Sequence, residues 1–142
     1  MIRKSSILIT GAGGEVGSQL IDHFAHQDNI NIVTLDLHPI KSDKVSDQIT
    51  GNILDQSLLE QINLEFEITE IYHLAAILST RAELSPKSAH DVNVNGSINL
   101  LELALKQSRS QNKPVKFFFP SSIAVYGVEE RIDSCSENEY LN

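Results

Sequence analysis

Three glycines near the start of the chain have the spacing of an anion-binding turn. Gly11, Gly14 and Gly17 follow the apolar run of residues 7–9, and residues 15–27 carry apolar side chains at helical spacing. The glycines therefore lie where a strand is expected to pass into a helix. The first turn of a helix has free N–H groups and the positive end of the helix dipole, which together favour a phosphate.

Each glycine of this turn has its own expected role. We expect Gly11 to make the tight turn and Gly14 to let a phosphate approach the backbone, where a Cβ atom would collide with it. We expect Gly17 to let the helix pack closely on the strand. Glu15 and Val16, which open the helix between Gly14 and Gly17, are also candidate contacts of the anion.

An acidic residue gives the turn a more specific meaning. Glycine clusters alone are often plain loops, and Gly13 adds a second possible glycine spacing. The expected strand at 31–35, however, ends at Asp36, roughly 20 positions past the turn, where a carboxylate can bind the two ribose hydroxyls of an adenosine. That carboxylate would repel a 2′-phosphate, and the nearest cation is Lys41. The pattern predicts NAD as the cofactor, with Leu37 beside its adenosine.

Composition narrows the class of protein. The 142 residues, 41% of them hydrophobic, fit one domain with a substantial core. A formal charge of −8 argues against a nucleic-acid partner, because such sites need clustered lysine and arginine. Cys135 is the only cysteine, so no disulfide within the chain and no cysteine metal cluster is expected. Without a signal-like segment or a membrane-length apolar run, we expect a cytoplasmic protein with no membrane contact.

Strand-like and helix-like segments alternate along the chain. This alternation predicts an α/β fold with a doubly wound parallel sheet, that is, a Rossmann-type, three-layer α/β/α domain. Asp55 is the expected N-cap of the helix after the third strand. The expected strands are residues 7–9, 31–35, 47–50, 70–76 and 115–120, and a long helix is expected at 86–108, with a loop at 77–85.

The ends of the third and fourth strands supply further candidates. Asn52 could hydrogen-bond the edge of an adenine and Ile53 could pack on its face, although a turn followed by a helix start explains this stretch equally well. The fourth strand ends in the HLAA sequence of residues 73–76, where small side chains leave room for the phosphates and ribose of a cofactor. Within it, Leu74, Ala75 and Ala76 are cofactor candidates, whereas His73 is expected to be a core histidine.

Later polar residues are candidates for the reacting end of the site. Ser79 and Thr80 make the loop after the fourth strand suitable for substrate contact. Ser121 and Ser122 follow the last expected strand and would face a nicotinamide, because ligands bind at strand carboxyl ends in such sheets. Asn93 interrupts the apolar pattern of the long helix, where asparagine is unfavourable, so something other than helix propensity is expected to hold it there.

Together these motifs resemble the extended branch of the short-chain dehydrogenase/reductase family, the NAD-dependent epimerase/dehydratase group. The resemblance implies that NAD is the cofactor and that Asn93 lies at the active site and steadies it. It implies that Ser122 is catalytic and hydrogen-bonds the reacting oxygen of a small-molecule substrate. It also implies that the full-length protein can form a homodimer. No metal-ligating residues are expected. The motifs that carry it are residues 10–17, 51–55, 73–76, 93–96 and 121–127.

Within the group, residues 75–79 and 119–127 look most like the epimerase-like L-threonine dehydrogenases. Those enzymes oxidise the β-hydroxyl of threonine with NAD. Nucleotide-sugar epimerases and dehydratases share most of the same signals, so an amino acid and a nucleotide-sugar both remain candidate substrates. A non-catalytic module that binds or senses the dinucleotide is a further alternative.

The sequence departs from the family at the catalytic base. The family uses the tyrosine of a Y-x-x-x-K pair, whose lysine lowers the tyrosine pKa. Here Tyr126 has Glu130 four residues on, and Tyr140 is only two residues from Asn142. We therefore expect residues 1–142 to be an NAD-binding domain that stops before the catalytic pair and the substrate domain, and to be inactive alone.

Overall fold

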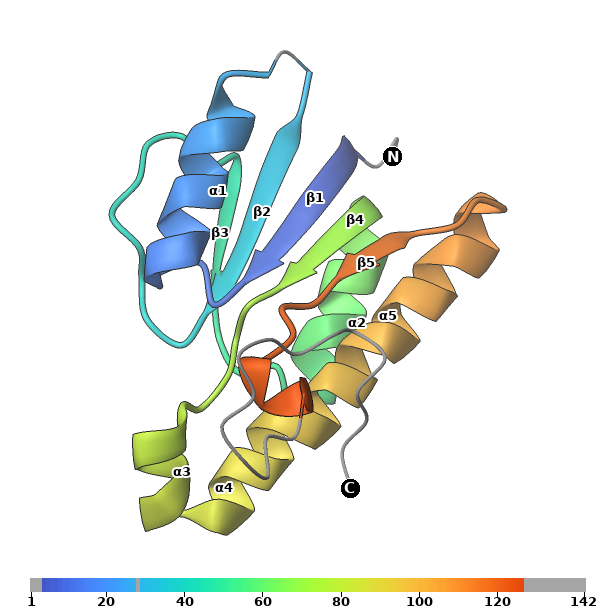
Figure 1. The fold of residues 1–142 in the computed structure, drawn as a ribbon. Helices are drawn as coiled ribbons and strands as arrows, with labels where there is room; N and C mark the ends of the chain where they lie inside the picture. Colours follow the sequence, from blue (N-terminus) through green and yellow to red (C-terminus); the bar gives the residue numbers. More distant parts are fainter. Residues whose placement is uncertain (1–3, 28, 127–142) are drawn as a thin grey trace.

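The computed structural model describes residues 4–27 and 29–126 of the chain. Five strands form one sheet in the order β3-β2-β1-β4-β5, and every neighbouring pair is parallel (Figure 1). The order runs outward in both directions from β1, which is the arrangement of a doubly wound sheet. The strands are β1 (Lys4–Thr10), β2 (Asn31–Asp36), β3 (Asp47–Thr50), β4 (Phe66–His73) and β5 (Lys116–Phe118).

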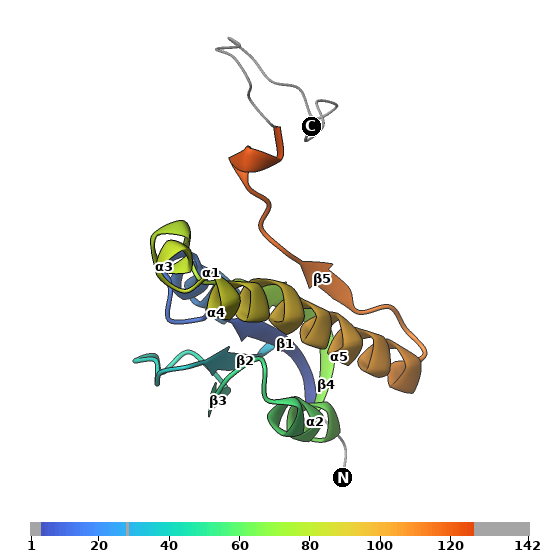
Figure 2. The same cartoon turned by 90° about the horizontal axis from the view of Figure 1, so that it is seen from below.

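Helices cover both faces of this sheet. The helix α1 (Glu15–Ala25) packs on one face, and α2 (Gln56–Glu65) and α5 (Gly96–Gln111) pack on the other (Figures 1 and 2). The predicted three-layer Rossmann-type fold is therefore confirmed. The shorter elements are α3 (Ser79–Leu84), α4 (Pro86–His90), the π-helical turn η1 (Asp91–Asn95) and the 3-10 turn η2 (Ile123–Tyr126).

Two apolar clusters fill the spaces between the layers. Successive side chains of a strand point to opposite faces, so β1 supplies both clusters. Ile7 and Ile9 pack toward α1, whereas Leu8 packs toward α2 and α5. The same alternation in β2 separates Ile32 from Val33. The central strands are thus buried on both sides, as parallel sheets require.

Several of the predicted segments differ from the structure. The fourth strand, expected at 70–76, is β4 at Phe66–His73. The expected loop at 77–85 contains α3, whose sequence STRAEL is rich in helix-forming residues that its polarity concealed. The expected helix at 86–108 is interrupted, because α4 passes through η1 before α5 begins, and α5 continues to Gln111. The predicted N-cap is confirmed, since Asp55 accepts hydrogen bonds from Ser57 N and Leu58 N.

The last strand is shorter and more exposed than its apolar sequence indicates. We expected a buried strand at 115–120, but β5 spans Lys116–Phe118, and Phe118 and Phe119 are 44% and 58% exposed. The reason is the position of β5 at the edge of the sheet, paired with β4 alone. Apolar composition predicts burial only when both sides of a strand are covered.

Two helices each bury only part of their apolar side chains. The helix α5 buries Leu100, Leu103 and Ala104, while Leu101 and Leu105 are exposed. In α1, Ile21 and Phe24 are buried, but Val16 is exposed. With 3.6 residues per turn, only one stripe of each helix can face the sheet.

Candidate functional site

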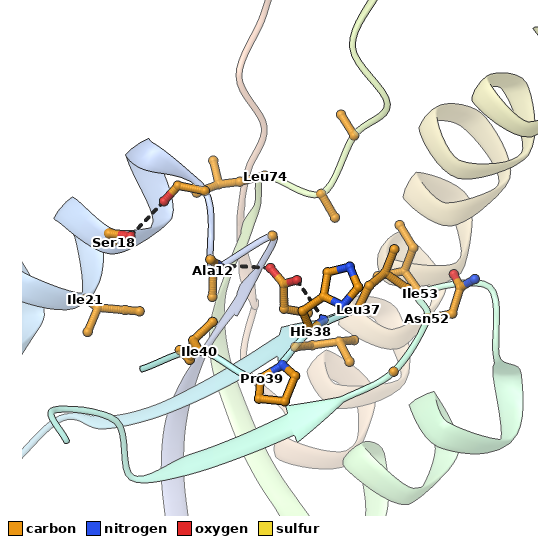
Figure 3. A pocket seen from close by; sticks show the side chains of 18 of the residues that line it. Ala12, Ser18, Ile21, Leu37, His38, Pro39, Ile40, Asn52, Ile53 and Leu74 are labelled. Atoms are coloured by element: carbon orange, nitrogen blue, oxygen red, sulfur yellow. Dashed lines mark hydrogen bonds between the residues drawn. The ribbon is translucent and has the colours of Figure 1, made fainter. Parts of the chain in front are cut away.

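A cavity of about 960 Å³ opens at the carboxyl ends of the strands (Figure 3). Its walls come from the glycine turn after β1, the end of β2 with the loop that follows, the turn after β3, and the segment after β4. In doubly wound sheets, ligands bind at this edge, where neighbouring crossovers diverge. The predicted cofactor residues that line it are Gly11, Gly14, Asp36, Leu37, Asn52, Ile53, Leu74, Ala75 and Ala76.

Two glycines of the turn are required by the backbone itself. Gly11 has a φ of +67°, and a Cβ there would lie 2.7 Å from Ala75 N. A Cβ on Gly17 would lie 2.7 Å from Ala12 Cα, so α1 could not pack as closely on the turn. The tight turn and the close helix packing expected from the sequence are therefore both present.

Gly14 differs, because a Cβ there would make only one tight contact. Its φ of −74° suits any residue, and a Cβ there would meet Gly11 O alone, at 3.3 Å. Gly14 is the N-cap of α1, and no side chain caps this helix end. The N–H groups of the first turn are therefore available to an anion. Glu15 and Val16 begin this turn but do not line the cavity in the part of the chain that the structure describes.

The carboxylate of Asp36 is held at the rim of the cavity by backbone groups. Gly13 N donates to Oδ2 at 2.9 Å, and His38 N donates to Oδ1 at 3.2 Å (Figure 3, dashed lines). Each carboxylate oxygen can accept more than one hydrogen bond, so both remain able to accept from ribose hydroxyls. The glycine turn thus orients the acidic residue that the sequence analysis assigned to ribose.

Sequence reasoning missed this role of Gly13. It treated Gly13 as an ambiguity of spacing, although a Cβ there would lie 3.3 Å from Asp36 Oδ2 and 3.2 Å from Ile40 Cγ2. Ile40 also lines the cavity, together with His38 and Pro39, in the stretch between the expected strands at 31–35 and 47–50 (Figure 3). The signal that could have found them is their place directly after Asp36.

Beyond β3, Asn52 and Ile53 lie at the rim as expected, but they differ in how much of each side chain is available to a ligand. Asn52 Oδ1 accepts a hydrogen bond from Leu54 N at 3.0 Å, which leaves its amide nitrogen as the available donor. Ile53 is only 5% exposed and packs in the cluster under α2 and α5. Its first role is therefore in the core, and only a small part of it faces the cavity.

Asn93 lies in η1 and acts on the segment after β4. Its Oδ1 accepts from Ile77 N at 2.7 Å, and its Nδ2 donates to Ile77 O at 2.9 Å. The amide thus pairs with both polar groups of one backbone residue, which explains how an asparagine is held within a helical segment. Ile77 lines the cavity, whereas Asn93 itself does not among the described residues.

His73 is the buried core histidine that the sequence predicted. It is 1% exposed, and its two ring nitrogens contact Thr10 Oγ1 at 2.8 Å and Ser97 Oγ at 2.9 Å. Burial lowers the pKa of His73 to about 4, so the ring is neutral at pH 7.

The two serines expected to face the nicotinamide do not lie at the cavity. Ser121 and Ser122 are exposed and do not line it, because the chain after β5 leads away from the sheet (Figure 2). Ser79 and Thr80 begin α3, where the structure describes only the backbone. Cys135 and Tyr140 lie outside the described residues.

The residues of the cavity fit a dinucleotide. An open helix N-terminus without a side-chain cap suits a diphosphate, and a fixed carboxylate across the turn suits a ribose. Within residues 4–27 and 29–126, no group of three or more His, Cys, Asp or Glu side chains could hold a metal ion. No helix in that part of the chain is long and apolar enough to cross a membrane.

The family model of the NAD dependent epimerase/dehydratase family matches residues 7–142. The chain belongs to this family. A curated relative, an uncharacterized epimerase/dehydratase of Staphylococcus aureus (strain USA300), is 33% identical over 125 residues, which are 85% of this chain and 37% of the relative. The cofactor that the sequence predicted is the cofactor of the family.

Solved structures of the family share the fold. A monomeric L-threonine 3-dehydrogenase from a metagenome is 38% identical, with a TM-score of 0.77 over 96% of this chain and 42% of that one. The holo form of a GalE-like L-threonine dehydrogenase from Cupriavidus necator is 29% identical, with a TM-score of 0.79 over 96% and 44%. A UDP-glucose 4-epimerase from Brucella ovis in complex with NAD is 27% identical, with a TM-score of 0.77 over 97% and 42%. The chain thus spans less than half the length of these relatives.

Proposed function

We propose that the chain is the NAD-binding part of a longer oxidoreductase that acts on a CH–OH group, of the L-threonine 3-dehydrogenase type. The NAD-binding part of the proposal is carried by one observation. Asp36 is held beside the uncapped N-terminus of α1, because Gly13 N donates a hydrogen bond to Asp36 Oδ2 at 2.9 Å. A diphosphate on the helix and a ribose on the carboxylate would place an adenosine over the end of β2.

The proposed contacts follow the cavity wall. Gly11, Gly14 and the N–H groups of Glu15 and Val16 would hold the diphosphate, and Asp36 and Leu37 the adenosine ribose. Asn52 and Ile53 would border the adenine. The segment after β4 would border the second ribose, and Ser121 would lie near the nicotinamide. The residues of that segment proposed to contact the cofactor are Leu74, Ala75 and Ala76.

When bound, NAD would accept a hydride from the carbon that carries the substrate hydroxyl. Ser122 would hydrogen-bond that hydroxyl oxygen, while Asn93 would hold the neighbouring backbone through Ile77. The proton of the hydroxyl must pass to a base, which in the proposal is a Y-x-x-x-K tyrosine beyond residue 142. The chain alone should therefore bind NAD without turning over a substrate.

The cofactor part is tested by calorimetry on the 142-residue chain with NAD and with NADP. Binding of NAD, and weaker binding of NADP, is expected because the Asp36 carboxylate repels a 2′-phosphate. Absence of NAD binding at millimolar concentration would remove the proposal.

The substrate part requires a longer chain that includes the Y-x-x-x-K pair. L-Threonine is the first substrate to test, supported by the similarity to L-threonine dehydrogenases at up to 38% identity. NADH formation with L-threonine is the expected result. Conversion of UDP-glucose to UDP-galactose without net NADH would instead favour the second candidate, a nucleotide-sugar epimerase, which the likeness to UDP-glucose 4-epimerases supports.

A non-catalytic dinucleotide sensor is the candidate from another class. It predicts NAD binding by the 142-residue chain, no activity in any longer form, and a partner protein whose affinity changes with the dinucleotide.

We also propose that the longer protein forms a homodimer, supported by the exposed apolar side chains Ile98, Leu101 and Leu105 of α5. Sedimentation of the longer protein tests this state directly.

A further inference from the structure

We propose that His73 is a positioning residue, which links the glycine turn to the segment after β4 and so sets the separation of two walls of the cavity. This inference deepens the proposed function and rests on NAD binding at that cavity. It assigns to a core histidine a task beyond filling space.

The link is a continuous chain of hydrogen bonds across the sheet and into η1. Thr10, which precedes the glycine turn, contacts His73 Nδ1 at 2.8 Å, and His73 Nε2 contacts Ser97 Oγ at 2.9 Å. Ser97 Oγ donates to Asn93 O at 2.7 Å, and the Asn93 amide holds Ile77 at both its N–H and its carbonyl. The chain of bonds thereby joins β1, β4, η1 and α5 to Ile77 in the segment after β4.

Both ends of this chain reach the cavity. Thr10 is followed directly by Gly11, and Ile77 belongs to the segment that forms the opposite wall. Thr10 also bonds that segment near its start, because Leu74 N donates to Thr10 O at 3.1 Å and Ala75 N donates to Thr10 Oγ1 at 3.4 Å. Without His73, the far end of the segment at Ile77 would keep its tie to Asn93 but lose its tie to the turn.

The hydrogen bonds determine the tautomer of His73. The Ser97 hydroxyl donates its hydrogen bond to Asn93 O. Its oxygen must therefore accept a hydrogen bond from Nε2–H of the His73 ring. Nδ1 is then the acceptor, and Thr10 donates its hydroxyl proton to it. Every donor of the chain has one acceptor, and a flip of the ring would break two bonds at once.

The surroundings make this chain stiff. His73 is 1% exposed, and the rings of Phe117 and Phe119 lie beside it, with centroids at 6.1 Å and 5.5 Å. Buried polar groups that lose a partner have no water to replace it. The connection therefore favours a single spacing between Gly11 and Ile77.

The test compares the NAD dissociation constants of His73→Phe and Ser97→Ala with that of the wild-type chain, under conditions where circular dichroism shows each to be folded. Both variants should bind NAD roughly 5- to 20-fold more weakly, which lies within the span of effects that substitutions along coupled residue networks produce. Ser97→Thr keeps the hydroxyl, and threonine in a helix can still bond the carbonyl four residues back, so it should bind within about twofold of wild type.

Gln107→Leu is the matched control for loss of a buried polar network. Gln107 is fully buried and bonds Ile68 N and Phe66 O, each at 3.0 Å, near the opposite end of β4. This variant should lower stability and leave the NAD dissociation constant within about twofold of wild type. An equal loss of affinity in Gln107→Leu would mean that general destabilisation causes the effect, and would overturn the inference.

Nitrogen NMR of the His73 ring supplies a second readout. A neutral ring with the proton on Nε2 is expected, and a proton on Nδ1 would contradict the assigned chain. If the wild-type chain fails to bind NAD, the proposed function fails. If it binds and both His73→Phe and Ser97→Ala bind equally well, only the positioning role fails.

Discussion

Backbone N–H groups hold the carboxylate of Asp36 in one position, so its side chain has little freedom to rotate. Gly13 and His38 each donate one N–H to a different oxygen of the carboxylate. The side chain is thus fixed before any ligand arrives, and a ligand that uses it loses less conformational entropy on binding. This preorganisation lies behind the expected preference for NAD.

Asp36→Ala tests that preference. The variant should bind NAD at least roughly 10- to 100-fold more weakly, because the loss of even one hydrogen bond to a charged acceptor costs about 1.5–3 kcal/mol. It should also discriminate less between NAD and NADP. Calorimetric titration with both dinucleotides measures each effect, with Asp47→Asn, at the amino end of β3, as the control. An unchanged preference would show that the ribose is bound elsewhere.

Gly14→Val tests the path of the diphosphate. Gly14 has an ordinary φ, and a Cβ there would be tight only against Gly11 O at 3.3 Å, so the variant should fold after a small local shift and lose NAD binding. Gly17→Val should instead destabilise the protein, because its Cβ would collide with the backbone of Ala12. Thermal melts followed by titration with NAD separate the two outcomes, and retained affinity in Gly14→Val would mean that no phosphate passes that backbone.

Among the elements, η1 shows how a helix accommodates polar residues that its propensity disfavours. π-helical turns inside α-helices are rare and occur frequently at functional sites. Here the turn presents Asn93 to Ile77 and leaves Asn93 O to accept from Ser97. The cost of an interrupted helix is offset by these bonds between elements.

The strand β4 carries a pH-dependent contribution to stability through His73. Its pKa is about 4 in the folded chain and near 6.5 when unfolded, so the unfolded chain binds the extra proton between these values. Stability should therefore fall as the pH drops from about 6.5 to 4, by at most roughly 3 kcal/mol.

Urea unfolding of wild type and His73→Phe across this range measures the effect. The difference between the two profiles isolates His73 from carboxylates such as Asp55, whose pKa is lowered mainly by the hydrogen bond from the Ser57 side chain. The variant should show the flatter profile below pH 6.5. Parallel profiles would mean that His73 does not remain neutral in the fold.

On the scale of the whole molecule, the cavity exists only because four strands end at one edge of the sheet. The turn after β1, Asp36 at the end of β2, Asn52 after β3 and Ala75 after β4 meet there although they span more than half of the described sequence. The exposed Ser121 and Ser122 lie apart from this assembly. In our proposal, they act only in the longer protein.

Ser122→Ala in that longer protein tests the catalytic assignment. Turnover should fall roughly 10²- to 10³-fold while the NAD dissociation constant changes less than about threefold, because a hydroxyl that contacts the reacting oxygen matters mainly in the transition state. Steady-state kinetics with L-threonine and separate NAD titrations give the two values. A loss confined to NAD affinity would reassign Ser122 to cofactor binding.

The succession of the five strands, the glycine turn, the N-cap Asp55 and the position of Asp36 were readable from the sequence alone. Each depends on local properties, namely the period of apolar residues, the freedom of glycine and the capping of a helix by its nearest side chain. Each of these features is specified by the few residues around it in the sequence. Local sequence therefore sufficed to predict the fold class and the cofactor.

Tertiary structure alone decided the remaining features. The bond from Gly13 to Asp36, the hold of Asn93 on Ile77 and the exposure of Phe118 on an edge strand all depend on partners distant in the sequence. Whether a polar group is satisfied, or an apolar one covered, depends on what the fold brings beside it. No local pattern contains that information.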